Sequence, residues 1–181
     1  MNISRTFISI LCIGTLMHLS AQESREDLYT AQNQNIRFGL VHDLDGAVNG
    51  DDYNGFTIAY AAKGIGTDQL VLSYSQLDPE NATSSMIQFS VEEYYAFSPT
   101  LFPYAIAGLG FLTSDDDVST NGEEDGFFGK IGFGLLFKTD SSFDVYLEAS
   151  HLASNDDLWA DGTEGVKDNH QQLILGVRVK Y

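Results

Sequence analysis

The sequence predicts an all-β protein, folded as a closed antiparallel eight-stranded up-and-down transmembrane β-barrel. Three observations predict this fold class. Eight segments alternate bulky apolar residues with small or polar ones, which is the period-two pattern of a β-strand. The connections between these segments alternate between long and short. The composition is rich in aromatic residues (12%) and glycine (17 residues) and poor in proline (3 residues), as in β-proteins.

The charge balance excludes several other classes of protein. The chain has 26 Asp and Glu residues against 9 Lys and Arg, a formal net charge of −17. It therefore lacks the basic patch that nucleic-acid binding requires, and we expect no nucleic-acid partner. Disordered chains have fewer aromatic residues and more charged residues than this chain, so the composition also excludes a disordered protein. After the N-terminus there is no run of about 20 apolar residues, which a membrane-spanning helix needs.

The first residues have the pattern of a secretory signal peptide. Arg5 is the only charged residue before position 23, the stretch from residue 7 to 19 is mostly apolar, and the small pair Ser20-Ala21 precedes a polar segment. We expect a signal peptide at 1–21, a polar periplasmic leader at 22–34 and the barrel domain at 35–181. The single cysteine, Cys12, leaves with the signal, so we expect no disulfide.

We expect the eight strands at residues 35–43, 53–63, 68–77, 85–97, 101–113, 126–138, 142–152 and 170–181. Each is close to the roughly 9–11 residues with which a tilted strand crosses a bilayer. The fifth segment is apolar or small on both faces, and its sequence does not orient it. The other seven have one bulky apolar face, in order: Ile36, Phe38, Leu40; Phe56, Ile58, Tyr60; Leu70, Leu72, Tyr74; Ile87, Phe89, Val91, Tyr95; Phe127, Ile131, Phe133, Leu135, Phe137; Phe143, Val145, Leu147; Leu173, Leu175, Val177, Val179, Tyr181.

The opposite faces decide which side points to the interior. They hold small residues such as Gly55, Ser73 and Gly132, which suit a crowded interior better than a solvated surface. Their charges have both signs and can neutralise one another inside a narrow barrel: Arg37, Glu92, Lys130, Asp144, Glu148, Arg178 and Lys180. We therefore expect the apolar faces to point toward lipid, and these charges to form ion pairs in the lumen rather than a polar pore.

The predicted connections at one end of the barrel are longer than those at the other end. The long ones are 43–53, 77–85, 113–126 and 153–169, and the short ones are 63–68, 97–101 and 138–142. Of the 26 acidic residues, 17 lie in the long connections. These acidic loops are candidates for weak association with divalent cations, but they lack EF-hand spacing, so we predict no defined metal site and no cofactor.

Three segments carry a resemblance to a known family: 103–111 (Pro-Tyr-Ala-Ile-Ala-Gly-Leu-Gly-Phe), 128–134 and the C-terminal 173–181. Together they resemble the small outer-membrane β-barrel family that includes OmpA- and OmpX-type barrels. The resemblance implies a Gram-negative outer membrane with long loops at the cell surface, and contact with lipid and lipopolysaccharide. It also implies that Gly176, Val179 and Tyr181 match the signal read by the barrel assembly machinery.

We expect a structural or surface-interaction protein without a reaction of its own, and two alternatives remain. His151, Ser154 and Glu164 are similar to the catalytic set of outer-membrane lipid A deacylases, although two residues separate His151 from Ser154 where that family has one. On a regular strand this spacing turns the two side chains to opposite faces. The second alternative is a soluble lipocalin-like carrier with the apolar faces inward.

Overall fold

The computed structural model describes residues 34–44, 54–64, 68–78, 83–115, 125–154, 159–161, 165–167 and 169–181. The predicted signal peptide and residues 22–33 of the leader lie outside these ranges. Where the structure is described, no helix is long and apolar enough to cross a membrane.

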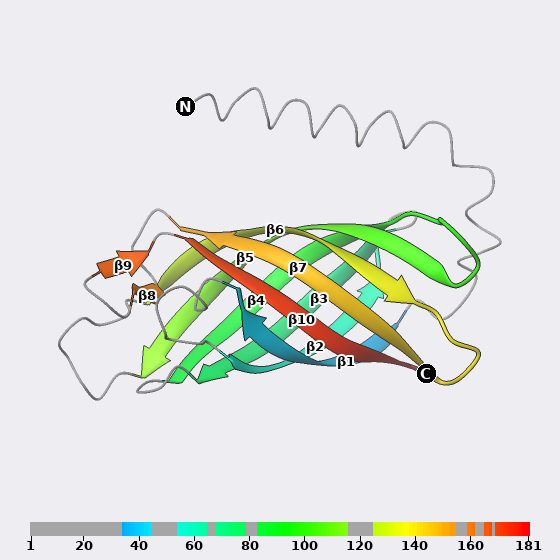
Figure 1. Cartoon of the computed structure of the whole chain (residues 1–181), viewed down its shortest axis with the longest axis horizontal. Helices are drawn as coiled ribbons and strands as arrows, with labels where there is room; N and C mark the ends of the chain where they lie inside the picture. The colour runs from blue at the N-terminus through cyan, green and yellow to red at the C-terminus, as the bar shows by residue number, and fades with distance from the viewer. Residues whose placement is uncertain are drawn as a thin grey trace, which may run out of the picture. The chain divides into compact units, whose positions relative to one another are not determined.

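Eight strands form one closed antiparallel barrel, in the order β1-β10-β7-β6-β5-β4-β3-β2 (Figure 1). Their bounds are β1 (Asn35–Asp43), β2 (Asn54–Lys63), β3 (Asp68–Asp78), β4 (Thr83–Tyr94), β5 (Leu101–Asp115), β6 (Gly126–Phe137), β7 (Phe143–Ala153) and β10 (Asn169–Lys180). Each strand pairs with its chain neighbours, and the last pairs with the first, so the predicted up-and-down barrel is confirmed. The sequence did not predict the small hairpin of β8 (Trp159–Asp161) and β9 (Gly165–Lys167) between β7 and β10.

The barrel closes between the two ends of the sheet. Nine residue pairs join β1 to β10, from Asn35 opposite Lys180 to Asp43 opposite Gln172. An open sheet edge would leave backbone N–H and C=O groups unpaired in the lipid, and this closure removes it.

Two predicted boundaries are wrong. β4 ends at Tyr94, because residues 95–100 form a turn in which Tyr95 N donates to the Pro103 carbonyl (2.8 Å). The predicted connection 77–85 between β3 and β4 is also too long. It spans only residues 79–82 and is shorter than the turn 95–100, because the β3–β4 ladder continues to Leu77 opposite Ser84. The strict alternation of long and short connections therefore fails at this hairpin.

The apolar faces point outward, as predicted. Leu40, Phe127 and Phe133 are 70%, 75% and 67% exposed, whereas small residues such as Ala61 and Ser75 are buried in the interior. The structure also orients β5, which turns Tyr104 inward and Leu109 outward. An exposed apolar surface this extensive marks a membrane contact, and the alternative of a lipocalin-like carrier with an apolar interior is wrong.

Candidate functional site

The interior of the barrel holds the predicted charges, and the first cluster surrounds Arg37 of β1. Its guanidinium forms a bidentate ion pair with Glu92 of β4, with Nη1–Oε1 and Nη2–Oε2 distances of 2.7 and 2.8 Å. Arg37 also donates to Gln69 Oε1 (2.7 Å) and Asn35 Oδ1 (3.0 Å). Tyr94 donates its hydroxyl to Glu92 Oε2 at 2.6 Å. Both charged groups are buried, so this pairing compensates their desolvation.

The register explains why Arg37 needs its own carboxylate. Arg37 lies directly opposite Arg178 in the β1–β10 ladder, and two like charges at such a position repel each other. Arg178 turns instead to Asp144 of β7, to which its Nε donates at 3.0 Å and its Nη2 donates as well. Each arginine thus has a separate buried carboxylate.

Asp144 also fixes the turn between β6 and β7. Its Oδ1 accepts from Lys180 Nζ (2.8 Å) and from the backbone N–H of Thr139 (2.9 Å). Lys180 Nζ in turn donates to the Thr139 carbonyl (3.1 Å). The turn at 138–142 is therefore bonded to the last strand, β10.

A third ion pair lies between β6 and β7. Lys130 Nζ is 2.7 Å from Glu148 Oε1 and donates to Gln88 Oε1 of β4 at 3.0 Å. Both charged residues are buried. The seven charges singled out from the sequence thus lie at inward-facing positions in three groups: Arg37 with Glu92, Lys130 with Glu148, and Asp144 with both Arg178 and Lys180.

Small residues make room for aromatic rings beside these ions. Tyr94 and Tyr104 stack with centroids 4.8 Å apart, and a Cβ on Gly134 would overlap the Tyr104 ring. Tyr146 packs against Gly176, where a Cβ would come within 2.6 Å of its ring. The Arg37 guanidinium lies over Tyr146, with Cζ 5.8 Å from the centroid, which is a cation–π contact. Rings and ions together fill this part of the lumen.

An apolar layer fills the lumen near the ends of β3 to β7 that lead into residues 79–82, 116–124 and 155–158. It consists of Leu77, Met86, Leu112, Phe128 and Leu152, each at most 2% exposed. All five lie within four residues of a strand end. These ends are at the same end of the barrel, because β4 and β6 begin there and the antiparallel strands β3, β5 and β7 end there. This layer was not predicted from the sequence, although large apolar residues at inward positions near long connections were a usable signal.

Two of the three residues of the deacylase alternative, His151 and Ser154, lie within the described residues. His151 faces outward from β7, where it lies opposite Ile131 and Gln171. Ser154 follows the end of that strand, and its hydroxyl donates to the Phe127 carbonyl at 2.8 Å. Glu164 lies outside the described residues. The hydroxyl proton of Ser154 is thus committed to a backbone acceptor, whereas a nucleophile donates it to the general base.

The predicted assembly residues lie on β10 and at its end. Gly176 faces inward, Val179 faces outward, and Tyr181 is 57% exposed. Most acids of the predicted loops lie outside the described residues, so their arrangement is not part of this structure. Within the described ranges, no group of three or more His, Cys, Asp or Glu side chains is placed to hold a metal ion.

No family model and no curated protein sequence matches the chain. Solved structures do match its fold. Neisserial surface protein A (NspA) aligns over 82% of this chain and 97% of its own, with 16% identity and a TM-score of 0.60. The N-terminal β-barrel domain of Pseudomonas aeruginosa OprF aligns over 83% and 98%, with 18% identity and a TM-score of 0.56. The Yersinia pestis outer membrane protein Ail, in a phospholipid nanodisc, aligns over 83% and 99%, with 13% identity and a TM-score of 0.51.

At these identities the likeness concerns the fold alone. The chain has the fold of the small eight-stranded outer-membrane β-barrels, as the resemblance of its sequence implied.

Proposed function

We propose that the protein is a non-enzymatic barrel of a Gram-negative outer membrane that displays acidic loops at the cell surface. The observation that carries this proposal is the filled interior. Three buried ion pairs, stacked tyrosines and an apolar layer occupy the lumen. A barrel of eight strands has room for little else, and open aqueous channels need about 16 strands. The structure therefore supports a scaffold rather than a diffusion pore.

The outer face of the barrel and the sequence both support the proposed surface location. A belt of exposed apolar side chains matches the lipid-facing band of outer-membrane barrels. The predicted signal peptide would direct the chain across the inner membrane, and the strand ends that lead into the acidic connections lie at the barrel end opposite the end of β10. Lipopolysaccharide, the barrel assembly machinery and divalent cations at the loops are the partners that this arrangement suits.

Cell fractionation with heat-modifiable electrophoresis tests the location. We expect the protein in the outer-membrane fraction, with different mobilities before and after boiling, because a closed barrel resists detergent until heated. Recovery from the periplasm as a soluble protein with one mobility would contradict the proposal. In planar bilayers, we expect the purified barrel to produce no stable conductance steps.

The lipid A hydrolase remains the second candidate in a different class, but the described geometry does not favour it. Ser154 donates to the Phe127 carbonyl, and His151 projects from the lipid-facing side of β7. Mass spectrometry of lipid A from cells with and without the protein tests it directly. We expect an unchanged acylation pattern.

A further inference from the structure

The apolar outer surface of the barrel is short on β3 and β4. A polar cross-strand pair limits it at each end, with Asp68 opposite Glu93 toward the turn 95–100 and Gln76 opposite Ser85 toward residues 79–82. Between these limits, the outward-facing pairs are apolar: Leu70 with Val91, Leu72 with Phe89 and Tyr74 with Ile87. The lipid-facing surface of this ladder therefore consists of only three apolar pairs.

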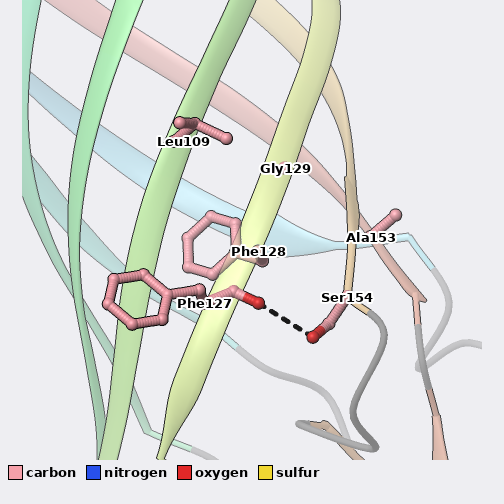
Figure 2. Close-up of a pocket in the computed structure, with 6 residues that line it drawn as sticks. All are labelled: Leu109, Phe127, Phe128, Gly129, Ala153 and Ser154. Atoms are coloured by element: carbon pink, nitrogen blue, oxygen red, sulfur yellow. Dashed lines mark hydrogen bonds between the residues drawn. The ribbon is translucent and has the colours of Figure 1, made fainter.

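The β5–β6 ladder has a longer apolar surface. Its outward-facing pairs are apolar or contain glycine without a polar interruption: Leu101 with Phe137, Pro103 with Leu135, Ala105 with Phe133, Ala107 with Ile131, Leu109 with Gly129 and Phe111 with Phe127. Figure 2 shows one end of this surface, where Leu109 and Phe127 are 70% and 75% exposed. This ladder thus has twice as many apolar pairs toward lipid as the β3–β4 ladder.

The difference can be expressed as a height along the barrel axis. Each strand residue advances about 3.3 Å, of which a strand tilt of about 40° leaves about 2.5 Å along the axis. The eight steps from Asp68 to Gln76 therefore separate the two polar pairs by about 20 Å. The ten steps from Leu101 to Phe111 cover about 25 Å and are apolar at both ends, which matches the band of about 25 Å in outer-membrane barrels.

The polar pairs resist contact with hydrocarbon. Asp68 and Glu93 lie directly opposite each other on the outer face, so a hydrocarbon layer that reached them would surround two neighbouring carboxylates. All four residues of the polar pairs are partly exposed, so the barrel itself does not cover them. Ser85 shares a hydrogen bond of 3.1 Å with the Tyr74 hydroxyl, which makes the limit at that end milder than the limit at the carboxylates.

We propose that the barrel thins the bilayer beside β3 and β4 by about 5 Å relative to the bilayer beside β5 and β6, an inference that rests on the proposed membrane location. A bilayer adapts to a short apolar surface by local thinning, which brings its headgroups to the level of the polar pairs. Lipids with shorter chains then fit the β3–β4 side, and lipids with longer chains fit the β5–β6 side. The barrel thereby sorts its neighbouring lipids by chain length.

Tryptophan quenching by a brominated lipid tests this difference. Trp159, the only tryptophan, is replaced by Phe, and one reporter is introduced by Leu72→Trp on β3 or by Phe133→Trp on β6, both at exposed apolar positions. The purified variants are reconstituted into vesicles of brominated dioleoylphosphatidylcholine mixed with the shorter dimyristoleoylphosphatidylcholine. We expect the shorter lipid to be favoured at least about twofold more strongly beside position 72 than beside position 133.

Removal of the carboxylates should abolish much of this preference. Asp68→Leu combined with Glu93→Leu extends the apolar surface toward the turn 95–100, so the preference beside position 72 should shift toward that beside position 133. Asp140→Leu, at an exposed position in the β6–β7 turn, is the matched control and should leave the preference unchanged. Heat-modifiable electrophoresis confirms that each variant forms a barrel, and the comparison of the two reporters does not depend on the double variant.

Three results would overturn the inference. They are an equal chain-length preference at the two reporters, an unchanged preference in the folded double variant, or no quenching at position 72. The last result would mean that protein, such as a second copy of the chain, covers β3 and β4 in place of lipid. Failure of the purified barrel to insert into vesicles would contradict the proposed function itself.

Discussion

Arg37 of β1 and Glu92 of β4 form an ion pair across the lumen, although β1 and β4 are not neighbouring strands. Both side chains point inward, because the period of a strand determines its faces. The stagger of the strands around the barrel sets the height of each residue and brings the two side chains together.

Removal of Glu92 should strongly destabilise the barrel. Glu92→Ala leaves Arg37 buried without its carboxylate and directly opposite Arg178 in the ladder. We expect the free energy of unfolding, measured with urea in detergent, to fall by about 3–5 kcal/mol. Asp140→Ala, at an exposed position in the β6–β7 turn, is the control and should change it by less than about 0.5 kcal/mol.

A compensating variant separates charge burial from lost packing. Arg37→Met combined with Glu92→Leu replaces the pair with apolar side chains and should recover most of the lost stability. If Glu92→Ala behaves like Asp140→Ala, the ion pair does not stabilise the barrel.

Two glycines of β6 should respond differently to the same substitution. Gly134→Ala places a methyl group in the Tyr104 ring and should cost about 1–3 kcal/mol of unfolding free energy. Gly129→Ala, whose methyl group points into open space, should be nearly neutral. Thermal unfolding of both variants checks this, and equal destabilisation would contradict the close packing of Tyr104.

At the scale of elements, the strands were more predictable than their ends. Alternation located the eight barrel strands. A strand with one face toward lipid carries an apolar side chain at every second position, and this period is visible in the sequence. It failed at the β3–β4 hairpin, where polar residues such as Ser84 continue the ladder as strand residues. It also missed β8 and β9, whose three residues each are too short to show a period.

The apolar layer should separate the polar interior from solvent on the loop side. Ser75 is buried and donates to Thr57 Oγ1 at 3.0 Å, below Leu77 on the same face of β3. With Cys12 removed in the mature chain, Ser75→Cys provides a single thiol. We expect slow labelling by a charged thiol reagent, and severalfold faster labelling when Leu112→Ala and Phe128→Ala are added. An unchanged rate would show that this layer is not the barrier.

A thiol at Thr100 provides the control for that experiment. Thr100 is exposed in the β4–β5 turn at the opposite end, so Thr100→Cys should label rapidly with or without the two alanine substitutions. A change in its rate would indicate general loosening of the barrel instead of a local opening.

Tyr181 should matter for assembly in cells more than for stability. It is 57% exposed beyond the end of β10, so its side chain contributes little to barrel packing. Tyr181→Ala should reduce the heat-modifiable fraction in the outer membrane, whereas the purified variant should refold in detergent as the wild type does. Tyr181→Phe, which keeps the aromatic ring, should assemble normally. A loss of refolding in detergent would instead indicate a structural role.

For the whole molecule, the sequence predicted the fold class and the direction of the apolar face in seven of the eight barrel strands. It left β5 unoriented and most of the interior undetermined. The fold follows from the period and from closure, which is the only way to satisfy every backbone group of a sheet in lipid. An apolar groove beside Gly129, lined also by Leu109 and Ala153, was not predicted, because Gly129 meets these two residues on separate strands. Such a juxtaposition exists only once the register is known.

The seam between β1 and β10 makes the barrel a ring in the topological sense. Asn35 and Lys180 lie opposite each other, and every strand of the barrel has two antiparallel neighbours. No barrel strand is first or last in the pairing order, although β1 precedes the others in the sequence. The contacts of the ring alone are thus compatible with a chain break at any of the turns.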